Sequence, residues 1–247
     1  GYEILIRGLV QGVGFRPFIC RLAGKYGICG EVKNLNNGVA IAVDCDRKTI
    51  DSFTNDILEL APPASRIKAI DLAMKPVAGF DNFSIVTSSL LDDQITEVSP
   101  DIAVCEDCIE EMSTDEGRID YPFINCTNCG PRFSIIMELP YDRPATTMNE
   151  FIMCSRCNSE YNNILDRRFH AQPVACNNCG PHYILKDNGR VVSDLYDIIA
   201  EISLKVESGE CVAVKGIGGY HLMCNALNEE AVSRLRYRKQ RDAKPFA

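Results

Sequence analysis

Apolar positions in the first 88 residues recur with period two in some stretches and with a helical period in others. Residues 3–7 form a short apolar strand pattern, and the glycine-rich stretch 8–14 that follows indicates a loop. Apolar side chains then recur on one helical face over 15–26, and Gly27 stands where a left-handed helix cap belongs. The pattern predicts a strand, a loop and a helix, in that order.

A hairpin and two further strands are predicted in the rest of this region. Strand patterns over 28–35 and 38–44 flank an Asn-Asn-Gly sequence, which is typical of a tight hairpin turn. The last two strands are predicted at 66–74 and 82–86, after a second helix.

The second helix is expected to bury one stripe of side chains. Ile50, Phe53, Ile57 and Leu58 recur at helical spacing, and a pair of prolines ends the pattern. The order is therefore β-α-β-β-α-β, with the strand at 82–86 as a short extra strand. We expect an α+β fold of the ferredoxin-like kind, with both helices on one face of an antiparallel sheet.

Beyond this region the pattern changes twice, so several domains are expected. No periodicity is clear over the stretch that leads to the cysteine-rich segment, and it reads as a linker. An α/β pattern follows that segment, with a helix at 195–207, a strand at 211–215 and a basic helix from Glu229. The expected parts are a first domain 1–88, a linker 89–103, a cysteine-rich domain 104–184 and the beginning of a second α/β domain 190–247.

The composition, with 46% hydrophobic and 24% charged residues, is that of an ordinary globular protein. No apolar run approaches the ~20 residues that would span a bilayer, so no membrane association is expected. The first residues do not form an export signal. The sequence also begins without Met, so we expect the natural chain to extend further. A net charge of −8 argues weakly against nucleic-acid binding by the whole surface.

Eight of the thirteen cysteines form four Cys-x-x-Cys pairs that repeat in tandem. The pairs that begin at Cys105 and Cys126 recur 49 and 50 residues later, at Cys154 and Cys176. The flanking residues repeat too, because Cys-Gly-Pro-Arg-Phe from residue 129 is echoed by Cys-Gly-Pro-His-Tyr. This is a duplication. In a chain long enough for a core, it indicates metal binding in a reducing compartment, and hence in the cytoplasm.

Four thiolates in two Cys-x-x-Cys turns suit the tetrahedral coordination of zinc. We therefore expect two structural zinc ions whose removal unfolds the segment. The expected ligands are Cys105, Cys108, Cys126, Cys129, Cys154, Cys157, Cys176 and Cys179. The sequence leaves open which pairs share an ion. The two pairs of one repeat could bind one ion together, or the two outer pairs could bind one ion and the two inner pairs the other. His170 and His182 are expected to be ordinary polar residues, and the five other cysteines to be small buried side chains.

A second candidate site lies where the first strand meets the first helix. A glycine-rich turn at a helix N-terminus can point its amides at a phosphate, and the helix dipole favours the anion. The stretch fits neither the dinucleotide fingerprint nor the Walker pattern with its lysine. The candidate phosphate-binding residues are Gln11, Gly12, Val13, Gly14, Phe15 and Arg16.

Two stretches carry a resemblance to a known family. Residues 10–16 (VQGVGFR) and 32–39 (VKNLNNGV) closely resemble the two signatures of the acylphosphatases. The resemblance implies that Arg16 holds the phosphate and that Asn34 orients the attacking water. Both roles are physically sound, because a guanidinium neutralises phosphoryl oxygens and a side-chain amide can fix a water in line with the leaving group.

The whole chain resembles the HypF family, carbamoyltransferases of [NiFe]-hydrogenase maturation. Besides the acylphosphatase-like part and the duplicated cysteines, the stretches 121–126 (YPFINC), 140–144 (PYDRP) and 166–173 (DRRFHAQP) carry the resemblance. Residues 214–222 and 238–246 resemble the start of a YrdC-like module that binds ATP.

The resemblance implies a carbamoyltransferase that hydrolyses carbamoyl phosphate in its first domain. The YrdC-like module then forms carbamoyl-AMP from ATP with Mg²⁺, and a further domain passes the carbamoyl group to the C-terminal cysteine of a HypE-like acceptor protein, where it becomes the cyanide ligand of the hydrogenase iron. Lys215, Lys239, Arg241 and Lys244 are assigned to the nucleotide. Because the chain reaches only the start of that module, we expect hydrolysis alone from it.

Two other functions remain open from the sequence. Zinc ribbons often bind nucleic acids, and 234–244 holds six basic residues, which would give strongly salt-dependent binding. Tandem Cys-x-x-Cys modules also resemble the zinc region of the chaperone DnaJ. A chaperone-like docking protein would lose its partner on chelation and keep its hydrolytic activity.

Overall fold

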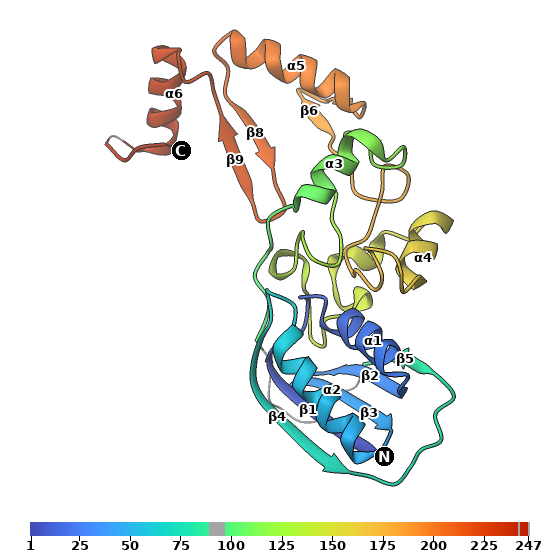
Figure 1. Cartoon of the computed structure of the whole chain (residues 1–247). Coiled ribbons are helices and arrows are strands. Elements are labelled where there is room, and N and C mark those ends of the chain that lie inside the picture. The colour runs from blue at the N-terminus through green and yellow to red at the C-terminus, as the bar shows by residue number, and fades with distance from the viewer. Residues whose placement is uncertain (89–96, 242, 247) are drawn as a thin grey trace. The chain divides into compact units, whose positions relative to one another are not determined.

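A computed structural model describes residues 1–88, 97–241 and 243–246 (Figure 1). The chain divides into two compact units, Gly1–Pro181 and His182–Ala247. Residues 89–96 of the predicted linker lie outside the described residues. Within the described part of the chain, no helix combines the length and the apolar character needed to cross a bilayer.

Five strands and two helices make up the first half of the N-terminal unit (Figure 1). They are β1 (Tyr2–Leu9), α1 (Phe15–Tyr26), β2 (Cys29–Leu35), β3 (Gly38–Asp44), α2 (Arg47–Leu60), β4 (Arg66–Met74) and β5 (Phe83–Ile85). The strands form one sheet in the order β4-β1-β3-β2-β5. Both helices pack their apolar faces into the cluster of buried side chains that also includes Ile4, Ile6 and Ile41 of the sheet. The predicted ferredoxin-like α+β fold is confirmed.

The sheet is mixed, so the prediction of a wholly antiparallel sheet was wrong at one edge. β5 runs parallel to β2, whereas the other pairs are antiparallel. After β4 the chain crosses to the opposite edge along the end of the sheet, and the Asp44 carboxylate accepts hydrogen bonds from the backbone amides of Ala78 (3.1 Å), Gly79 (2.7 Å) and Phe80 (3.3 Å). A strand that enters from this end must run opposite to β4 and therefore along β2.

The buried stripe of α2 is as predicted, with one exception. Ile50, Phe53 and Ile57 are fully buried, but Leu58 is 49% exposed. Successive residues on a helix point about 100° apart, so Leu58 is turned away from the face that carries Ile57. The helix begins at Asp46, whose carboxylate accepts the Thr49 amide hydrogen at 3.0 Å.

The cysteine-rich half of this unit holds little regular structure. Its elements are α3 (Glu106–Thr114), the 3-10 turns η1 (Phe133–Ile135), η2 (Arg143–Ala145) and η3 (Thr147–Glu150), and α4 (Ser155–Asn162). The first cysteine of each repeat, Cys105 or Cys154, is the residue from which the helix of that repeat starts. Its two buried clusters are small, and cysteines make up three of the eight buried members of one and two of the four buried members of the other. Apolar burial alone therefore contributes little to this half.

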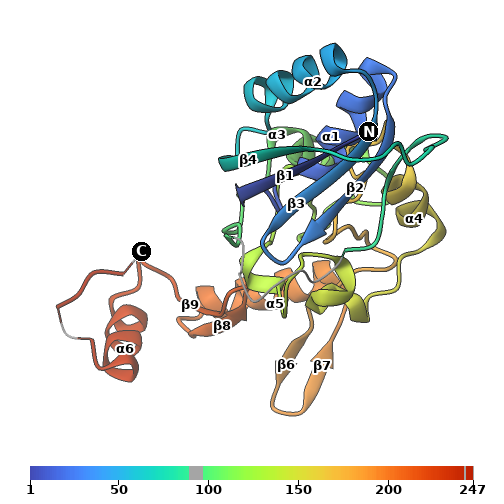
Figure 2. The same cartoon turned by 90° about the horizontal axis from the view of Figure 1, so that it is seen from below.

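The C-terminal unit alternates hairpins and helices (Figure 2). Its elements are β6 (Leu185–Asp187), β7 (Arg190–Val192), α5 (Leu195–Glu207), β8 (Val212–Lys215), β9 (Tyr220–Met223) and α6 (Glu229–Lys239). The predicted helix 195–207 and the start of the basic helix at Glu229 are confirmed. The β6–β7 hairpin was not predicted.

Candidate functional site

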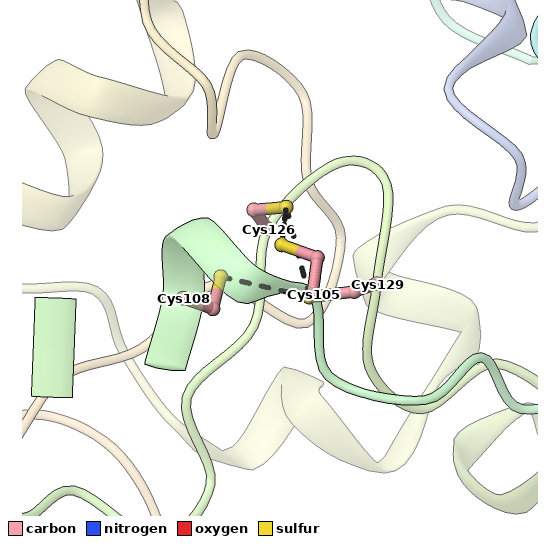
Figure 3. A group of neighbouring side chains, drawn as sticks. All are labelled: Cys105, Cys108, Cys126 and Cys129. Atoms are coloured by element: carbon pink, nitrogen blue, oxygen red, sulfur yellow. Dashed lines mark hydrogen bonds between the residues drawn. The ribbon is translucent and has the colours of Figure 1, made fainter. Parts of the chain in front are cut away.

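Each repeat gathers its own four cysteines into one cluster, and Figure 3 shows the cluster of the first repeat. The clusters are Cys105, Cys108, Cys126 and Cys129, and Cys154, Cys157, Cys176 and Cys179, with sulfurs within 4.8 Å of one another. Neighbouring sulfurs lie 3.5–3.8 Å apart in the first cluster and 3.7–3.8 Å in the second. Zinc–sulfur bonds of about 2.3 Å in a tetrahedron put sulfurs about 3.8 Å apart. Both clusters therefore fit a tetrahedral metal ion, and the crossed pairing of outer and inner pairs does not fit the structure.

Tight turns shape the second pair of each cluster. We call residues 126–129 the first knuckle and residues 176–179 the second knuckle. In both knuckles a backbone amide two residues on donates to the leading sulfur, from Asn128 to Cys126 and from Asn178 to Cys176, each at 3.4 Å. Such N–H···S bonds stabilise thiolates and fix the direction of the sulfur.

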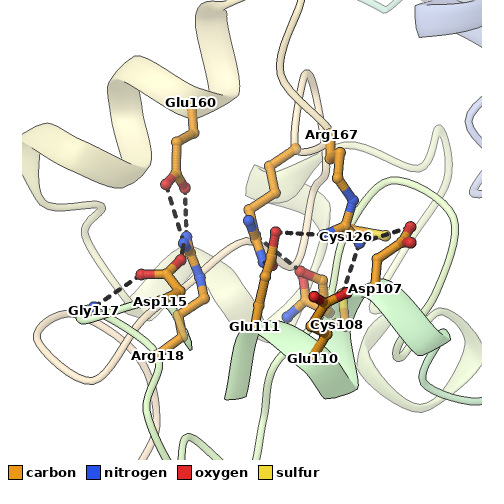
Figure 4. Close-up of polar contacts among 12 residues, drawn as sticks. Asp107, Cys108, Glu110, Glu111, Asp115, Gly117, Arg118, Cys126, Glu160 and Arg167 are labelled. Atoms are coloured by element: carbon orange, nitrogen blue, oxygen red, sulfur yellow. Dashed lines mark hydrogen bonds and ion pairs between the residues drawn. The ribbon is translucent and has the colours of Figure 1, made fainter. Parts of the chain in front are cut away.

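Each repeat contains a buried arginine that forms an ion pair with a glutamate of the other repeat. Arg118 is fully buried and forms an ion pair with Glu160 on α4, the helix of the other repeat (Figure 4). Arg168, 50 residues later, is likewise buried and forms an ion pair with Glu111 on α3. The Arg118 guanidinium also reaches the Cys157 sulfur at 3.5 Å. Each repeat thus supplies an arginine to the helix of its counterpart.

The first cluster receives a further cation from the second repeat. Arg167 donates to the sulfurs of Cys105 (3.4 Å) and Cys108 (3.3 Å) and to the carboxylate of Glu111 (2.5 Å) (Figure 4). Burial by itself raises the pKa of Glu111, but hydrogen bonds from Arg168 and Arg167 outweigh it and lower the pKa. Positive charge around the sulfurs offsets the negative charge of four thiolates on one divalent ion.

The phosphate loop, residues 10–16, joins β1 to α1. Gly12 and Gly14 hold φ values of 71° and 75°, left-handed conformations that side chains with a Cβ rarely adopt. Arg16 lies in the first turn of α1 and is 7% exposed, and Asn34 lies near the end of β2 and is 1% exposed. The sheet and the helix therefore bring the two predicted catalytic residues to the same side of the loop.

A loop from the cysteine-rich half closes this site. We call residues 140–143 the Tyr141 loop. The Tyr141 carbonyl accepts hydrogen bonds from Arg16 (3.3 Å) and Asn34 (3.1 Å), and its amide donates to the Gln11 side chain at 3.0 Å. The Asp142 carboxylate forms an ion pair with Arg16 at 2.6 Å. The side chains of Arg16 and Asn34 can therefore donate to the same acceptor, and in this structure that acceptor is the Tyr141 carbonyl oxygen.

A cavity of about 30 Å³ lies beside this point. Its walls come from both halves of the N-terminal unit, with Gln11, Gly12, Gly14, Arg16 and Asn34 from the first half and Thr127, Arg132, Tyr141, His170 and Gln172 among those from the second. The Asn34 Oδ1 is buried and accepts no hydrogen bond from the described residues.

His170 lines the cavity and belongs to neither cysteine cluster. Its ring packs against Tyr161 and Phe169, with ring centroids 4.8 and 4.7 Å away. Burial, and then the nearby Arg16 charge, lower the pKa of His170 from 6.5 to about 4. The imidazole is therefore neutral near pH 7.

Sequence reasoning missed the second wall of the cavity. The stretches that contain Tyr141, Asp142 and His170 were noted for their family resemblance, but no role was attached to them. They lie more than 100 residues after the phosphate loop, and no periodicity connects them with it. The one usable signal was polar residues between prolines in a cysteine-rich segment.

The four residues assigned to a nucleotide lie in the C-terminal unit. Lys215 is on β8 with its ammonium over the Tyr220 ring at 5.5 Å, whereas the other three are at or beyond the end of α6. The Arg241 guanidinium lies 5.6 Å from the Phe246 ring. The described contacts of this unit do not join Lys215 to Lys239, Arg241 or Lys244, so their assignment stays a prediction.

Three family models match successive parts of the chain. The acylphosphatase model covers residues 2–85, and the HypF finger model covers 104–136 and 153–185. The model called telomere recombination, for Sua5, YciO and YrdC proteins, covers 205–247.

Several known proteins are similar over the whole chain. Carbamoyltransferase HypF of Rhodobacter capsulatus is 44% identical over 100% of this chain, and a probable carbamoyltransferase HypF of Methanocaldococcus jannaschii is 43% identical over 99%. A crystal structure of full-length HypF in the phosphate- and nucleotide-bound form is 46% identical over the entire chain, with a TM-score of 0.91.

The chain spans about a third of the length of these relatives, 33%, 32% and 32% respectively. An acylphosphatase of Archaeoglobus fulgidus matches the first part alone. It is 34% identical over 84 residues, which make up 34% of this chain and 93% of that protein.

Metal removal should unfold the cysteine-rich half. The free energy of binding a structural zinc ion, of the order of 10 kcal/mol or more, exceeds what this half gains from its small apolar clusters. We expect the purified chain to contain two equivalents of zinc and Cys108→Ala to contain one, while Cys20→Ala, a buried cysteine outside the clusters, keeps two. Chelation should accelerate hydrogen exchange over 105–180. Unchanged exchange after complete metal loss would contradict a structural role.

The imidazole of His170 should titrate near pH 4. As pH falls below about 6.5, the unfolded chain takes up this proton before the folded chain does. Stability should therefore decrease by up to about 1.4 kcal/mol per pH unit until the folded pKa is reached. NMR titration measures the pKa, His170→Asn identifies the resonance, and the same substitution should flatten the pH dependence of unfolding between pH 6.5 and 4. A pKa near 6.5 would mean that the ring is solvated.

Proposed function

Because the chain belongs to the HypF family, of which it forms the N-terminal portion, we propose that it hydrolyses carbamoyl phosphate in the cavity between the phosphate loop and the Tyr141 loop. One observation carries this proposal. The side chains of Arg16 and Asn34 both donate hydrogen bonds to the Tyr141 carbonyl oxygen, at 3.3 and 3.1 Å. An oxygen of the substrate placed there would contact both groups.

The phosphoryl group would be bound by Arg16 and by amides of the phosphate loop. A guanidinium offers two parallel donors to phosphoryl oxygens. The N-terminus of α1 adds the positive end of its helix dipole. These groups also stabilise charge that develops on the phosphoryl oxygens during transfer.

Asn34 would orient the water that attacks phosphorus. Its Oδ1 is buried without a hydrogen-bond donor among the described residues, so it can accept an O–H hydrogen from a water. Attack forms one P–O bond and breaks the bond between phosphorus and the carbamate oxygen. Carbamate leaves with its electron pair, and a proton of the water passes to the phosphate. The products are carbamate and inorganic phosphate.

The phosphoryl group must displace Asp142 to reach Arg16. The carboxylate lies 2.6 Å from Nη2 of Arg16, where a phosphoryl oxygen would bind. Asp142 also accepts a hydrogen bond from Ser88, which can retain the carboxylate after displacement. The Asp142 charge therefore competes with the dianion for one guanidinium.

The remaining activities of the family are proposed at a coarser level. In the full-length protein, ATP would be used with the YrdC-like region, where Lys215, Lys239, Arg241 and Lys244 would contact its phosphates, and the carbamoyl group would pass to a HypE-like acceptor. We place the protein in the cytoplasm, because eight reduced thiolates need a reducing compartment. Both cysteine clusters would hold structural zinc.

Nucleic-acid binding by the cysteine-rich half is not favoured. Four of its arginines are buried and engaged with carboxylates and carbonyls of the protein, namely Arg118, Arg132, Arg143 and Arg168. The other two, Arg156 and Arg167, are more accessible but form ion pairs with Asp115 and Glu111. A phosphate backbone requires accessible cations. The chaperone-like alternative is supported by no particular observation in the described residues.

Removal of Arg16 should abolish hydrolysis. The rate of phosphate release from carbamoyl phosphate should fall at least ~100-fold in Arg16→Ala. The substrate loses the cation that binds two of its oxygens, and the transition state loses the positive charge that stabilises it. Asn34→Ala should lower kcat with little change in KM. Arg47→Ala, an exposed arginine of α2, serves as the control and should keep full activity. Undiminished turnover by Arg16→Ala would refute the assignment of the site.

Neutralising Asp142 should strengthen phosphate binding. Asp142→Asn keeps the size of the side chain and removes the competing charge, so KM for carbamoyl phosphate and Ki for inorganic phosphate should fall roughly tenfold, or about 1.4 kcal/mol. The matched control is Asp71→Asn, an exposed carboxylate that pairs with Arg7. A higher KM in Asp142→Asn would show that the carboxylate assists the substrate.

A further inference from the structure

Arg132 connects the phosphate loop with the first knuckle. It is 2% exposed, and its guanidinium donates to the backbone carbonyls of Gly12, Cys126, Thr127, Cys129 and Pro131. The bonds to Thr127 and Pro131 are both 2.9 Å long. Among the described residues no carboxylate forms an ion pair with this guanidinium, so carbonyl dipoles solvate its charge. One side chain thus holds two segments more than 100 residues apart.

The duplication provides an internal reference for this arginine. The residue that follows Cys-Gly-Pro is Arg132 after the first knuckle and His182 after the second, and His182 is exposed. The second knuckle still forms the same N–H···S bond of 3.4 Å, and its cluster has the same sulfur spacing. A knuckle of this kind therefore does not need a buried arginine. What distinguishes the first knuckle is its contact with the phosphate loop.

The contact fixes the peptide that follows Gly12. This glycine has a φ of 71°, and a Cβ added to it would lie 3.2 Å from Cδ of Arg132. In a trans peptide the C=O and the next N–H point in opposite directions. A Gly12 carbonyl held by Arg132 therefore turns the Val13 amide to the side away from the guanidinium. Without that bond the Gly12–Val13 peptide is free to rotate, because glycine tolerates several conformations.

We propose that Arg132 is a positioning residue for acyl phosphate hydrolysis. It holds the Gly12 carbonyl and thereby sets the direction of the amides that receive the phosphoryl group. Because the same guanidinium binds carbonyls of the first knuckle, the metal cluster and the phosphate loop are mechanically linked. The inference rests on the proposed hydrolysis and adds a residue from outside the acylphosphatase fold.

The test substitutes Arg132 by a neutral side chain of similar length. In the full chain, Arg132→Met should keep two equivalents of zinc while kcat/KM for carbamoyl phosphate falls roughly tenfold to a hundredfold, the cost of misplaced substrate-binding groups. His182→Gln alters the equivalent position after the second knuckle and should leave kcat/KM unchanged. Hydrogen exchange of the Val13 and Gly14 amides, measured without any ligand, should accelerate at least ~10-fold in Arg132→Met alone.

Two results would overturn the inference. Wild-type kinetics together with unchanged loop exchange in Arg132→Met would show that the arginine does not position the loop. Loss of one zinc equivalent in the same variant would show that the arginine builds the knuckle itself. If the wild-type chain releases no phosphate at all, the proposed function fails, and the exchange of the loop amides alone then decides the role of Arg132.

Discussion

A buried guanidinium must satisfy its hydrogen bonds within the protein, and this requirement organises the cysteine-rich half. Each guanidinium offers five N–H donors, and leaving them unpaired away from water costs several kcal/mol. Arg118 and Arg168 meet the requirement through carboxylates of the opposite repeat, while Arg143 uses the carbonyls of Gln172, Phe151 and Val174 at 2.7–2.9 Å. Distant segments are therefore held together where apolar contacts are few. The cysteine clusters, which fit a metal ion, and the arginine bonds take the place that a hydrophobic core has in the first half.

The same network determines the shape of the candidate active site. Arg143 anchors the Tyr141 loop, whose carbonyl and carboxylate meet Arg16 and Asn34. Whereas the phosphate loop and the two catalytic candidates belong to the ferredoxin-like fold, the opposite wall of the cavity belongs to the cysteine-rich half. An isolated acylphosphatase fold would leave this site open to solvent. The second wall leaves a cavity of about 30 Å³ and shields it in part from water, which strengthens each charge interaction there.

Local signals predicted much of this molecule, and distant contacts account for the rest. The period of apolar residues located α1, α2 and the strands, because each element buries one face, and the Cys-x-x-Cys spacing located both clusters. Leu58 is exposed because it points about 100° away from Ile57 around the helix axis. The parallel edge strand depended on a crossover without periodicity, held by Asp44. The contact of Tyr141 and Asp142 with the phosphate loop could not be predicted. It joins two domains, and neither the apolar periodicity of the first nor the cysteine spacing of the second depends on it.

The exchange of arginines between the repeats has the character of a two-fold interface. Arg118 reaches Glu160 as Arg168 reaches Glu111, so the two halves use the same surface toward each other, as subunits of symmetric dimers do. A single repeat on its own would keep Asp115 as an ion-pair partner of Arg118, but it would lack the glutamate that the helix of the other repeat supplies. The tandem segment thus has, within one polypeptide, the reciprocal contacts that are typical of a homodimer interface. The two repeats differ at the residue after Cys-Gly-Pro, which is Arg132 in the first repeat and His182 in the second.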